Sequence, residues 1–372
     1  MVTVHEVSSK RDQREFLNFP LRLYRDEPNF VPPLYGDEKK IFRSDYIYYD
    51  TCEAVYFLAE KDSRTAGRIS GILQKASNEK RGEKRIRFTR FDAVDDQEVA
   101  DALFRALEDW GRSKGMTEVC GPLGFSDLER EGLLVDGFEY LATFEEQYNY
   151  DYYGKLIEGC GYAKEVDWTE SRLKPNPEYV EQLDRLAAKY MERYKLHWGP
   201  ARNASDFINK YGEKFFELID KSYAELYGTV EFTKGMKDML ISNFKLVIKL
   251  DYVGILLDEN DAPVAMGLCF PAMADALVGS GGHLYPRTLV KLLYAINHPK
   301  VIDLALIGVD PEWANRGVSV IIISLLNHMM TDKNIEYAET NLNLEDNHAI
   351  LNLWKRFDRF EHKRRRSYLK QL

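Results

Sequence analysis

Residues 301–330 hold the side chains whose types and spacing indicate chemistry. Val301–Val309 is a nearly continuous apolar run, which is typical of a buried strand. A short loop, residues 312–316, then leads to Gly317 and an apolar helical stretch. Backbone N–H groups at the start of a helix have no intrahelical partner and bind phosphate oxygens, and Arg316 adds a charge suited to a pyrophosphate. The segment therefore predicts an anion site, with an ordinary strand-to-helix turn as the alternative.

The same segment resembles motif A of the GCN5-related N-acetyltransferase (GNAT) superfamily, V-x-P-x-(Y/W)-(Q/R)-x-x-G-x-(G/A). In this chain the motif runs from Val309 to Ser319 as VDPEWANRGVS. Two positions depart from the pattern, because Ala314 replaces the Gln or Arg that opens the loop and Ser319 replaces the final Gly or Ala. Ser319 is small enough to keep a close backbone approach. Ala314 removes a side-chain contact but leaves the backbone N–H groups of the loop in place.

The resemblance implies that this half of the chain binds CoA. Backbone groups of the family's fourth strand bind the pantetheine arm as a partner strand would, and the loop binds the pyrophosphate. Downstream, ETNLNLEDNHAILNLWKRF resembles the family's fifth strand and the helix that follows it. That helix often carries a Tyr that protonates the leaving thiolate, and a Trp stands there in this chain, so the acid step is left open. The implied cofactor-binding residues are Ile307, Gly308, Val309, Asn315, Arg316, Gly317, Val318, Ser319, Asn347 and Trp354.

Two carboxylates are candidates for the catalytic base that accepts a proton from the attacking amine. Asp303 matches the position where several family members carry a Glu, within the apolar strand Val301–Val309. Its alternative is a place in solvent at a frayed strand end. Glu339 lies on the expected fifth strand and, by the two-residue period of a strand, faces the same side as Asn341 and Asn343.

The elements that must position these residues occur in the same order in both halves. Tyr56–Leu73 and Val253–Phe270 each read as a strand, a polar turn and a strand. An amphipathic helix, Gln97–Gly115 or Gly317–Lys333, follows in each half and leads to another strand. This order predicts a mixed α/β fold with a partly antiparallel sheet, because a doubly wound fold would alternate strands and helices from the start. The alternative is that the two halves are unrelated α/β domains whose strands and helices occur in the same order by chance.

The composition predicts a domain boundary at KPNPE, residues 174–178, because two prolines separate a strand-like ending from a helical start. We expect two tandem GNAT-like domains, each a mixed, largely antiparallel sheet flanked by helices. Residues 1–173 are interpreted as a degenerate GNAT-like domain without a CoA phosphate loop, since the corresponding stretch, FDAVDDQEVA, has no glycine and its carboxylates would repel a pyrophosphate. Residues 174–372 are interpreted as the GNAT-like acyl-CoA-binding domain.

Three further stretches, PNFVPPL from Pro28, GPLGFS from Gly121 and the segment after Asn149, resemble a bacterial branch of tandem GNAT-like proteins. That branch includes ceramide-synthase-like proteins, which acylate a long-chain amine. The implied function is an acyl-CoA-dependent N-acyltransferase that uses acetyl-CoA or a longer acyl-CoA as co-substrate. A small-molecule or lipid-like amine would attack the thioester directly. A narrower alternative is that the acceptor is an aminoacyl or peptidyl amine. The alternative function is a non-catalytic CoA-binding or protein-interaction module.

Composition narrows the remaining function classes. The chain has 372 residues and a net charge of −9, which disfavours a general role in nucleic-acid binding. Residues 1–173 carry 25 Lys and Arg against 34 Asp and Glu, whereas residues 174–372 carry 26 of each, so an anionic ligand suits the second half better. No His or Cys spacing is typical of a metal site, and the four cysteines are expected to be reduced thiols.

Two further patterns bear on location. The N-terminus has no apolar signal-peptide core, and the longest apolar run, residues 318–326, is shorter than the roughly 20 residues that span a bilayer, so we expect a cytoplasmic protein. Lys355–Lys370 carries eight Lys and Arg against two Asp and Glu. As a functional segment it would neutralise a CoA phosphate or make a peripheral membrane contact. The structural alternative is a solvated helix face followed by an edge strand.

Overall fold

The computed structural model describes residues 1–245 and 247–372, which divide into two compact units. The first unit consists of Met1–Trp168, Met273–Leu292 and Lys363–Leu372, and the second of Thr169–Ala272 and Leu293–His362. The units are therefore interleaved in sequence, whereas the composition suggested one boundary after residue 173. The backbone contact from Tyr35 N–H to Gly282 O, 2.9 Å, is one reason that the segment from Met273 joins the first unit.

The first unit contains a mixed sheet with the strand order β1, β2, β3, β4, β5, β14, and β6 also pairs with β14. Neighbouring strands are antiparallel except for β4 and β5, which are parallel. The expected hairpin is present, and its turn lies at Asp62 and Ser63, which both have positive φ. The strands are β1 (Val2–Glu6), β2 (Cys52–Lys61), β3 (Arg64–Gln74), β4 (Arg85–Ala93), β5 (Glu118–Gly121), β6 (Leu133–Asp136) and β14 (Phe357–Gln371).

Helix α4 (Gln97–Ser113) follows β4 as expected from its apolar period. Its Val99, Leu103 and Leu107 side chains are fully buried, and Asp96 caps its N-terminus. Helix α1 (Lys10–Leu23) begins with a capping box in which Ser9 and Asp12 satisfy each other's backbone N–H groups. The other helices of the first unit are α2 (Tyr35–Glu38), α3 (Lys75–Arg81), α5 (Tyr153–Gly159) and α9 (Ala274–Leu277), while α10 (Pro286–Asn297) crosses the boundary between the units.

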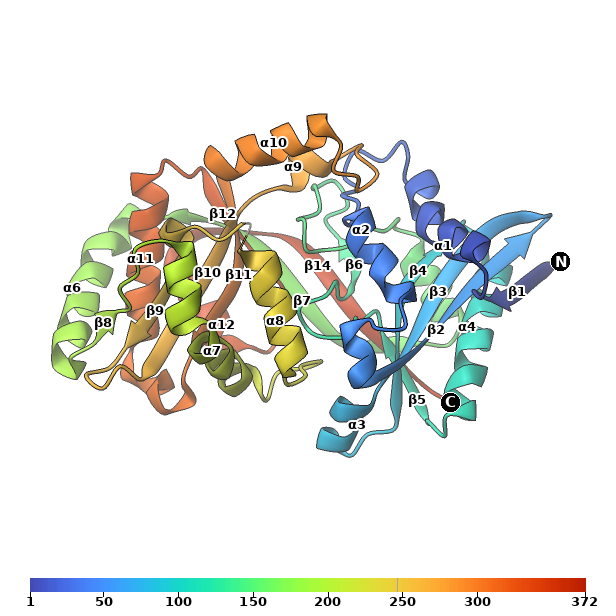
Figure 1. The fold of residues 1–372 in the computed structure, drawn as a ribbon, viewed down its shortest axis with the longest axis horizontal. Helices are drawn as coiled ribbons and strands as arrows, with labels where there is room; N and C mark the ends of the chain where they lie inside the picture. Colours follow the sequence, from blue (N-terminus) through green and yellow to red (C-terminus); the bar gives the residue numbers. More distant parts are fainter. Residues whose placement is uncertain (246) are drawn as a thin grey trace. The chain divides into compact units, whose positions relative to one another are not determined.

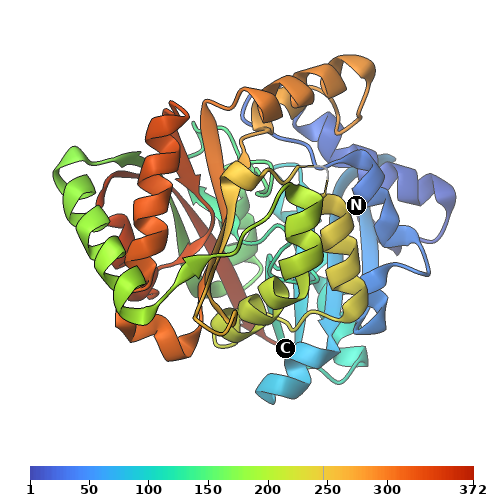
Figure 2. The same cartoon turned by 60° about the vertical axis from the view of Figure 1, so that its left-hand side comes forward.

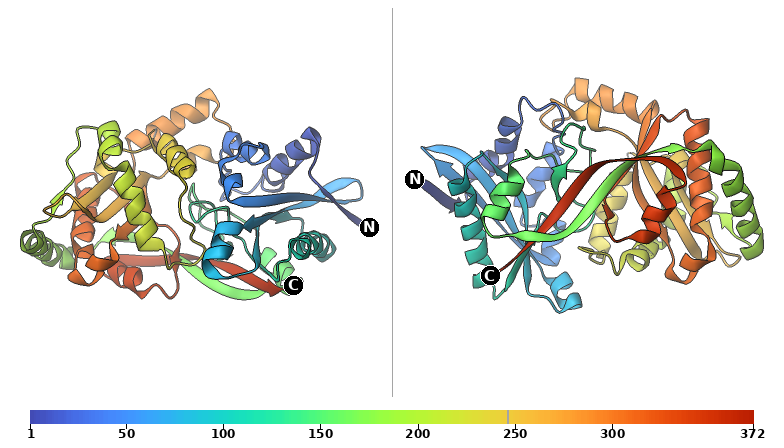
Figure 3. Two further views of the ribbon diagram at one scale, coloured as in Figure 1. Left: turned by 60° about the horizontal axis from the view of Figure 1, so that its bottom comes forward. Right: turned by 180° about the vertical axis from the view of Figure 1, so that it is seen from behind.

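The second unit contains a mixed sheet with the strand order β7, β12, β11, β10, β9, β8 (Figure 1). Here the one parallel pair among the registers described is β11 with β12, so both units place a single parallel pair after an antiparallel hairpin. Strands β14, red in Figure 3, and β7, light green, run side by side, and each is divided between the units: β7 after Trp168 and β14 after His362. The strands are β7 (Ala163–Pro175), β8 (His197–Trp198), β9 (Val253–Leu257), β10 (Pro263–Pro271), β11 (Val301–Val309), β12 (Tyr337–Thr340) and β13 (Asn343–Leu344).

Helices α6 (Pro177–Tyr194) and α11 (Ser319–Asp332) pack against each other and close the core of the second unit (Figure 1). Ile323 of α11 meets Ile302 of β11 and Ala338 of β12 in this core, and all three side chains are fully buried. Helix α7 (Ala204–Tyr223) contacts β10 and β11. The remaining helices are α8 (Lys234–Phe244) and α12 (His348–Trp354). The mixed α/β fold expected from the element order is confirmed.

The basic segment Lys355–Lys370 does not form a solvated edge strand, and that alternative is wrong. Most of it belongs to β14, which is an interior strand. Lys363 and Arg365 are 1% and 0% exposed, and Arg366 bonds to Asp167 at 2.8 Å. Lys370 donates to Glu108 at 2.7 Å. Because an interior strand faces protein on its edges, its charges are matched by buried acids rather than by water.

We predict that Ile323→Ala lowers the free energy of unfolding by about 2–5 kcal/mol, because it leaves a cavity in a fully buried site. Leu325→Ala in the same helix is the matched control, since Leu325 is 42% exposed, and should change stability by less than about 0.5 kcal/mol. Urea unfolding followed by circular dichroism measures both. Equal effects of the two substitutions would contradict the described orientation of α11.

Candidate functional site

The candidate site begins where β11 and β12 part. Their parallel pairing joins Val301–Leu304 to Tyr337–Thr340 and ends there, while β11 continues to Val309. On the other side of β11, Cys269 pairs with Leu304 and Leu268 with Leu306, so Ala305 is the extra residue of a β-bulge. A bulge bends and twists its strand, which separates the far part of β11 from β12.

The packing of β11 gives independent evidence for this bulge. Ile302 packs against the core that contains Ile323, and Ile307 packs against the neighbouring core that contains Ile321 and Ile322. Both side chains therefore reach α11 although they are five residues apart. In a regular strand, residues an odd number apart face opposite sides, so the extra residue reverses the alternation.

The two candidate bases, Asp303 and Glu339, are brought together by the sheet register. Asp303 pairs with Glu339 across β11 and β12, and Glu339 pairs in turn with Arg172 of β7. Directly paired residues project from the same face of a sheet, so the two carboxylates are neighbours on one face. Asp303 is 7% exposed and Glu339 is 5% exposed. The alternative that placed Asp303 in solvent at a frayed strand end is wrong.

Glu339 is held by two basic side chains. The Nε2 of His362 lies 2.9 Å from Oε1 of Glu339, and the Nε of Arg172 lies 3.5 Å from Oε2. The His362 side chain is fully buried. An ionised carboxylate accepts hydrogen bonds only, so Nε2 of His362 carries the proton when Glu339 is charged. The sequence interpretation missed His362, because the two partners lie on different strands and no local spacing relates them.

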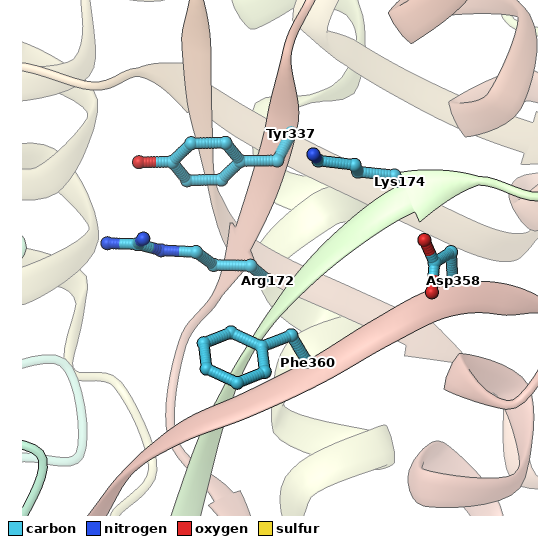
Figure 4. Close-up of a pocket in the computed structure, with 5 residues that line it drawn as sticks. All are labelled: Arg172, Lys174, Tyr337, Asp358 and Phe360. Atoms are coloured by element: carbon cyan, nitrogen blue, oxygen red, sulfur yellow. The ribbon is translucent and has the colours of Figure 1, made fainter.

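A pocket of about 280 Å³ lies within the second unit. Figure 4 shows Tyr337, Arg172 and Phe360 pointing in one direction from β12, β7 and β14. The Arg172 guanidinium lies over the Tyr337 ring, 4.7 Å from its centre. By the two-residue period, Tyr337 lies on the same face as Glu339, so the pocket and the carboxylates share one side of the sheet. The lining residues are Arg172, Lys174, Tyr337, Asp358 and Phe360.

The expected phosphate loop is a short 3-10 helix, Pro311–Arg316, followed by Gly317. Gly317 has φ +78°, and a Cβ atom there would meet the Tyr190 ring at 2.6 Å, so only glycine fits. Asn315 and Arg316 are exposed, and the Arg316 guanidinium lies 4.5 Å from the centre of the Trp313 ring. No side chain caps α11, which begins directly after Val318. The loop geometry fits the anion site that the sequence indicated, and its contact with CoA stays a prediction.

Tyr223, at the end of α7, lies against the part of β11 beyond the bulge. Its hydroxyl donates to Ile307 O at 3.1 Å and lies 3.3 Å from Ile307 N. A Cβ atom on Gly308 would meet the Ser222 hydroxyl at 2.7 Å, so Gly308 allows this close approach. Tyr223 therefore occupies the backbone groups that were expected to bind pantetheine. No local pattern predicted this contact, because α7 precedes β11 by about 80 residues and only tertiary packing joins them.

Two other predicted cofactor residues have structural contacts. The Asn347 side chain caps α12 by accepting from Ile350 N. Trp354 is buried and donates its indole N–H to Asn343 at 2.6 Å. Their predicted roles toward CoA stay predictions.

The cysteines bear on whether an acyl-enzyme forms. Burial, followed by the charge of Asp303, raises the pKa of Cys269 to about 12. Burial raises the pKa of Cys52 to about 11 and that of Cys120 to about 12, and it also raises the pKa of Cys160. A thiol is a weak nucleophile when protonated, so these groups are poorly suited to attack a thioester.

Among residues 1–245 and 247–372, no group of three or more His, Cys, Asp or Glu side chains is arranged to hold a metal ion. The same residues include no helix that is long and apolar enough to cross a membrane.

Comparison with known proteins places this geometry in a wider context. No protein-family model matches the chain. Protein YghO of Escherichia coli (strain K12) is 26% identical over 375 residues, covering 98% of this chain and 94% of that protein. Bacterial ceramide synthase of Caulobacter vibrioides (strain NA1000 / CB15N) is 27% identical over 325 residues, covering 84% of this chain and 81% of that protein.

A solved tandem GNAT protein from the clavulanic acid biosynthesis pathway (without AcCoA) has the same fold. It matches with a TM-score of 0.55 and 11% sequence identity, covering 100% of this chain and 98% of that chain. The chain therefore has a tandem GNAT fold, as its motif A segment and repeated element order predicted. Its resemblance to the ceramide-synthase-like branch is also confirmed by the Caulobacter relative.

We predict that His362→Phe lowers the free energy of unfolding by about 1–3 kcal/mol, because it removes a hydrogen-bond donor from a buried carboxylate. His362→Gln keeps an N–H donor at a similar distance along the side chain and should cost less. Urea unfolding at neutral pH compares the two variants. If His362→Gln is as unstable as His362→Phe, packing of the ring rather than the bond to Glu339 is what His362 supplies.

Proposed function

We propose that the chain is an acyl-CoA-dependent N-acyltransferase whose second unit binds the acyl-CoA. The observation that carries the proposal is the edge of β11 beyond Ala305, which leaves β12 and leads directly into the Gly317 loop. Two buried carboxylates, Asp303 and Glu339, lie immediately before the point of separation. An extended thioester ligand, an anion loop and a proton acceptor would thus meet along one strand.

In this proposal the pantetheine arm runs along the Ile307–Val309 backbone and the pyrophosphate meets the start of α11. The exposed Asn315 and Arg316 would contact phosphate oxygens, together with the backbone of Gly317–Ser319. Residues 174–372 carry equal numbers of basic and acidic side chains, whereas residues 1–173 carry an excess of acidic ones. The second half therefore repels an anionic ligand less than the first half does. Tyr223 must leave Ile307 before pantetheine can bond there, because one backbone N–H cannot serve both partners.

The reaction would be a direct transfer. The neutral amine nitrogen attacks the thioester carbonyl carbon, a C–N bond forms, the C–S bond breaks, and CoA leaves as the thiolate or, once protonated, as the thiol. The proton lost by the amine goes to a carboxylate, for which Glu339 and Asp303 are the two candidates. His362 would act as a positioning residue, since it holds Glu339 in place without reaching the surface.

The first unit is proposed not to bind CoA. At the start of α4, where a phosphate would lie, the Asp96 carboxylate accepts from Glu98 N and pairs with Lys61. The place is thus filled by a charge of the same sign as a pyrophosphate. The strand β4 also has a register shift near Arg90, and this side chain bonds to Glu38 at 3.0 Å.

The amine acceptor is proposed to be lipid-like, since a relative of similar length is named a bacterial ceramide synthase. In the pocket on the same side of the sheet, Asp358 would pair with the amine and the rings of Tyr337 and Phe360 would contact its apolar chain, although the lining also includes the cations Arg172 and Lys174. A cytoplasmic location and acetyl-CoA or a longer acyl-CoA as donor belong to the same proposal.

We predict that the purified chain binds acetyl-CoA or palmitoyl-CoA with micromolar affinity in calorimetric titration. Arg316→Glu should weaken binding by about tenfold or more, because it reverses an exposed charge beside the phosphates. Glu339→Gln should bind normally but lose at least about a hundredfold of the transfer rate to a long-chain amine. Cys269→Ser is the control and should keep activity. A folded protein that binds neither thioester would refute the proposal and favour a protein-interaction module.

We also predict that Tyr223→Phe tightens CoA binding by about three- to tenfold, because CoA no longer has to displace the hydroxyl from Ile307. The matched control is Tyr211→Phe in the same helix, whose hydroxyl donates to Pro200 O instead. Calorimetry of both variants decides the question. Weaker binding by Tyr223→Phe would mean that the hydroxyl contributes to the CoA site instead of blocking it.

A further inference from the structure

Helix α10, orange at the top of Figures 1 and 2, and the two residues before it expose an unusual amount of apolar surface. Of the ten large apolar side chains that are exposed in the described residues, six lie between residues 284 and 294. Their exposed fractions range from 46% for Leu289 to 67% for Tyr294. Scattered exposed apolar residues are ordinary, but a contiguous group marks an interaction surface. The six are Leu284, Tyr285, Leu289, Val290, Leu293 and Tyr294.

All of the group except Leu284 lies along one face of the helix. Successive helical residues are about 100° apart, so Tyr285, Leu289 and Leu293 form a row, and Val290 and Tyr294 continue it around the helix over about half a turn. The opposite side is anchored, since Thr288 and Leu292 are buried. The exposed apolar face is therefore fixed in direction and is not a loosely held segment.

Two basic side chains lie beside the apolar face of α10. Arg287 and Lys291 lie next to Tyr294 along the same helical wheel, and both are exposed. Neither forms an ion pair within the part of the chain that the structure describes. From His283 to Lys300 the sequence contains no Asp or Glu. An apolar arc bordered on its exposed edge by unmatched cations is complementary to a surface that is apolar inside and anionic outside.

The loop before α10 is held firmly against the first unit. A Cβ atom on Gly282, which has φ +74°, would meet Pro33 O at 1.9 Å, so the backbones touch there. The rings of His283 and Tyr35 stack at 4.4 Å. This anchoring reduces the entropy cost of binding, because the helix is already formed and oriented before it meets a partner.

We propose that α10 docks the protein onto the surface of an anionic lipid bilayer, lying flat with its apolar arc among the acyl chains and Arg287 and Lys291 at the headgroups. Helices with a broad apolar face and basic flanks bind bilayers in this way. A second copy of the chain fits less well, because facing α10 helices would bring their unmatched cations together without an acidic partner on either helix. The proposal is independent of the acyl-transfer reaction.

The test is sedimentation of the full chain with phospholipid vesicles that contain about one third phosphatidylglycerol, or phosphatidylcholine alone. We expect binding to the anionic vesicles that Leu289→Glu with Leu293→Glu reduces by about tenfold or more. Arg287→Glu with Lys291→Glu should reduce binding to anionic vesicles and leave any binding to neutral ones unchanged. Leu325→Glu, at another exposed position, is the control and should bind as the unsubstituted chain does.

Unchanged vesicle binding by the Leu289 and Leu293 variant would overturn the proposal. So would a dimer, seen by analytical ultracentrifugation, that this variant dissociates, because α10 would then be a self-association surface. Circular dichroism of the same variant reports its folding, and calorimetry with acetyl-CoA and palmitoyl-CoA reports its thioester site. A folded variant with normal thioester binding and unchanged vesicle binding rejects the membrane proposal alone, whereas binding of neither thioester by the folded, unsubstituted chain rejects the proposed function alone.

Discussion

The bulge at Ala305 is the constraint on which the rest of the site depends. The extra residue in β11 lies where its pairing with β12 ends, after Leu304 and Thr340. It also reverses which face of the sheet the following side chains point to. Strand β12 ends at Thr340, so its pairing does not reach the part of β11 beyond the bulge. The same extra residue keeps Ile307 against α11 while Asp303 faces the other side. The β-bulge at Ala305 thus determines both which side chains of β11 enter the core and which face the candidate site.

Buried charge is the second organising feature. A carboxylate removed from water needs charged or polar partners, and Glu339 has His362 and Arg172 from two other strands. Strand β14 extends this arrangement into the first unit, where Arg366 meets Asp167 and Lys370 meets Glu108. The basic C-terminal segment therefore serves internal pairing.

The two units share one order of elements but differ at the start of the helix that follows the first parallel strand. Each has an antiparallel hairpin, one parallel pair and a helix after the first parallel strand. In the first unit the start of α4 is capped by Asp96, while in the second the start of α11 follows a glycine and carries no side-chain cap. A single side chain at a helix N-terminus is enough to favour or exclude an anionic ligand there.

The sequence by itself determined the elements and the loop. The apolar run fixed β11 at Val301–Val309, and the glycine after Arg316 fixed the loop, because both signals depend on neighbouring residues only. The register that pairs Asp303 with Glu339, the partner His362 and the Tyr223 hydroxyl on Ile307 were decided by tertiary structure. These contacts join residues from separate strands and helices, and the free energy that selects them comes from packing of the whole unit, which no local pattern records.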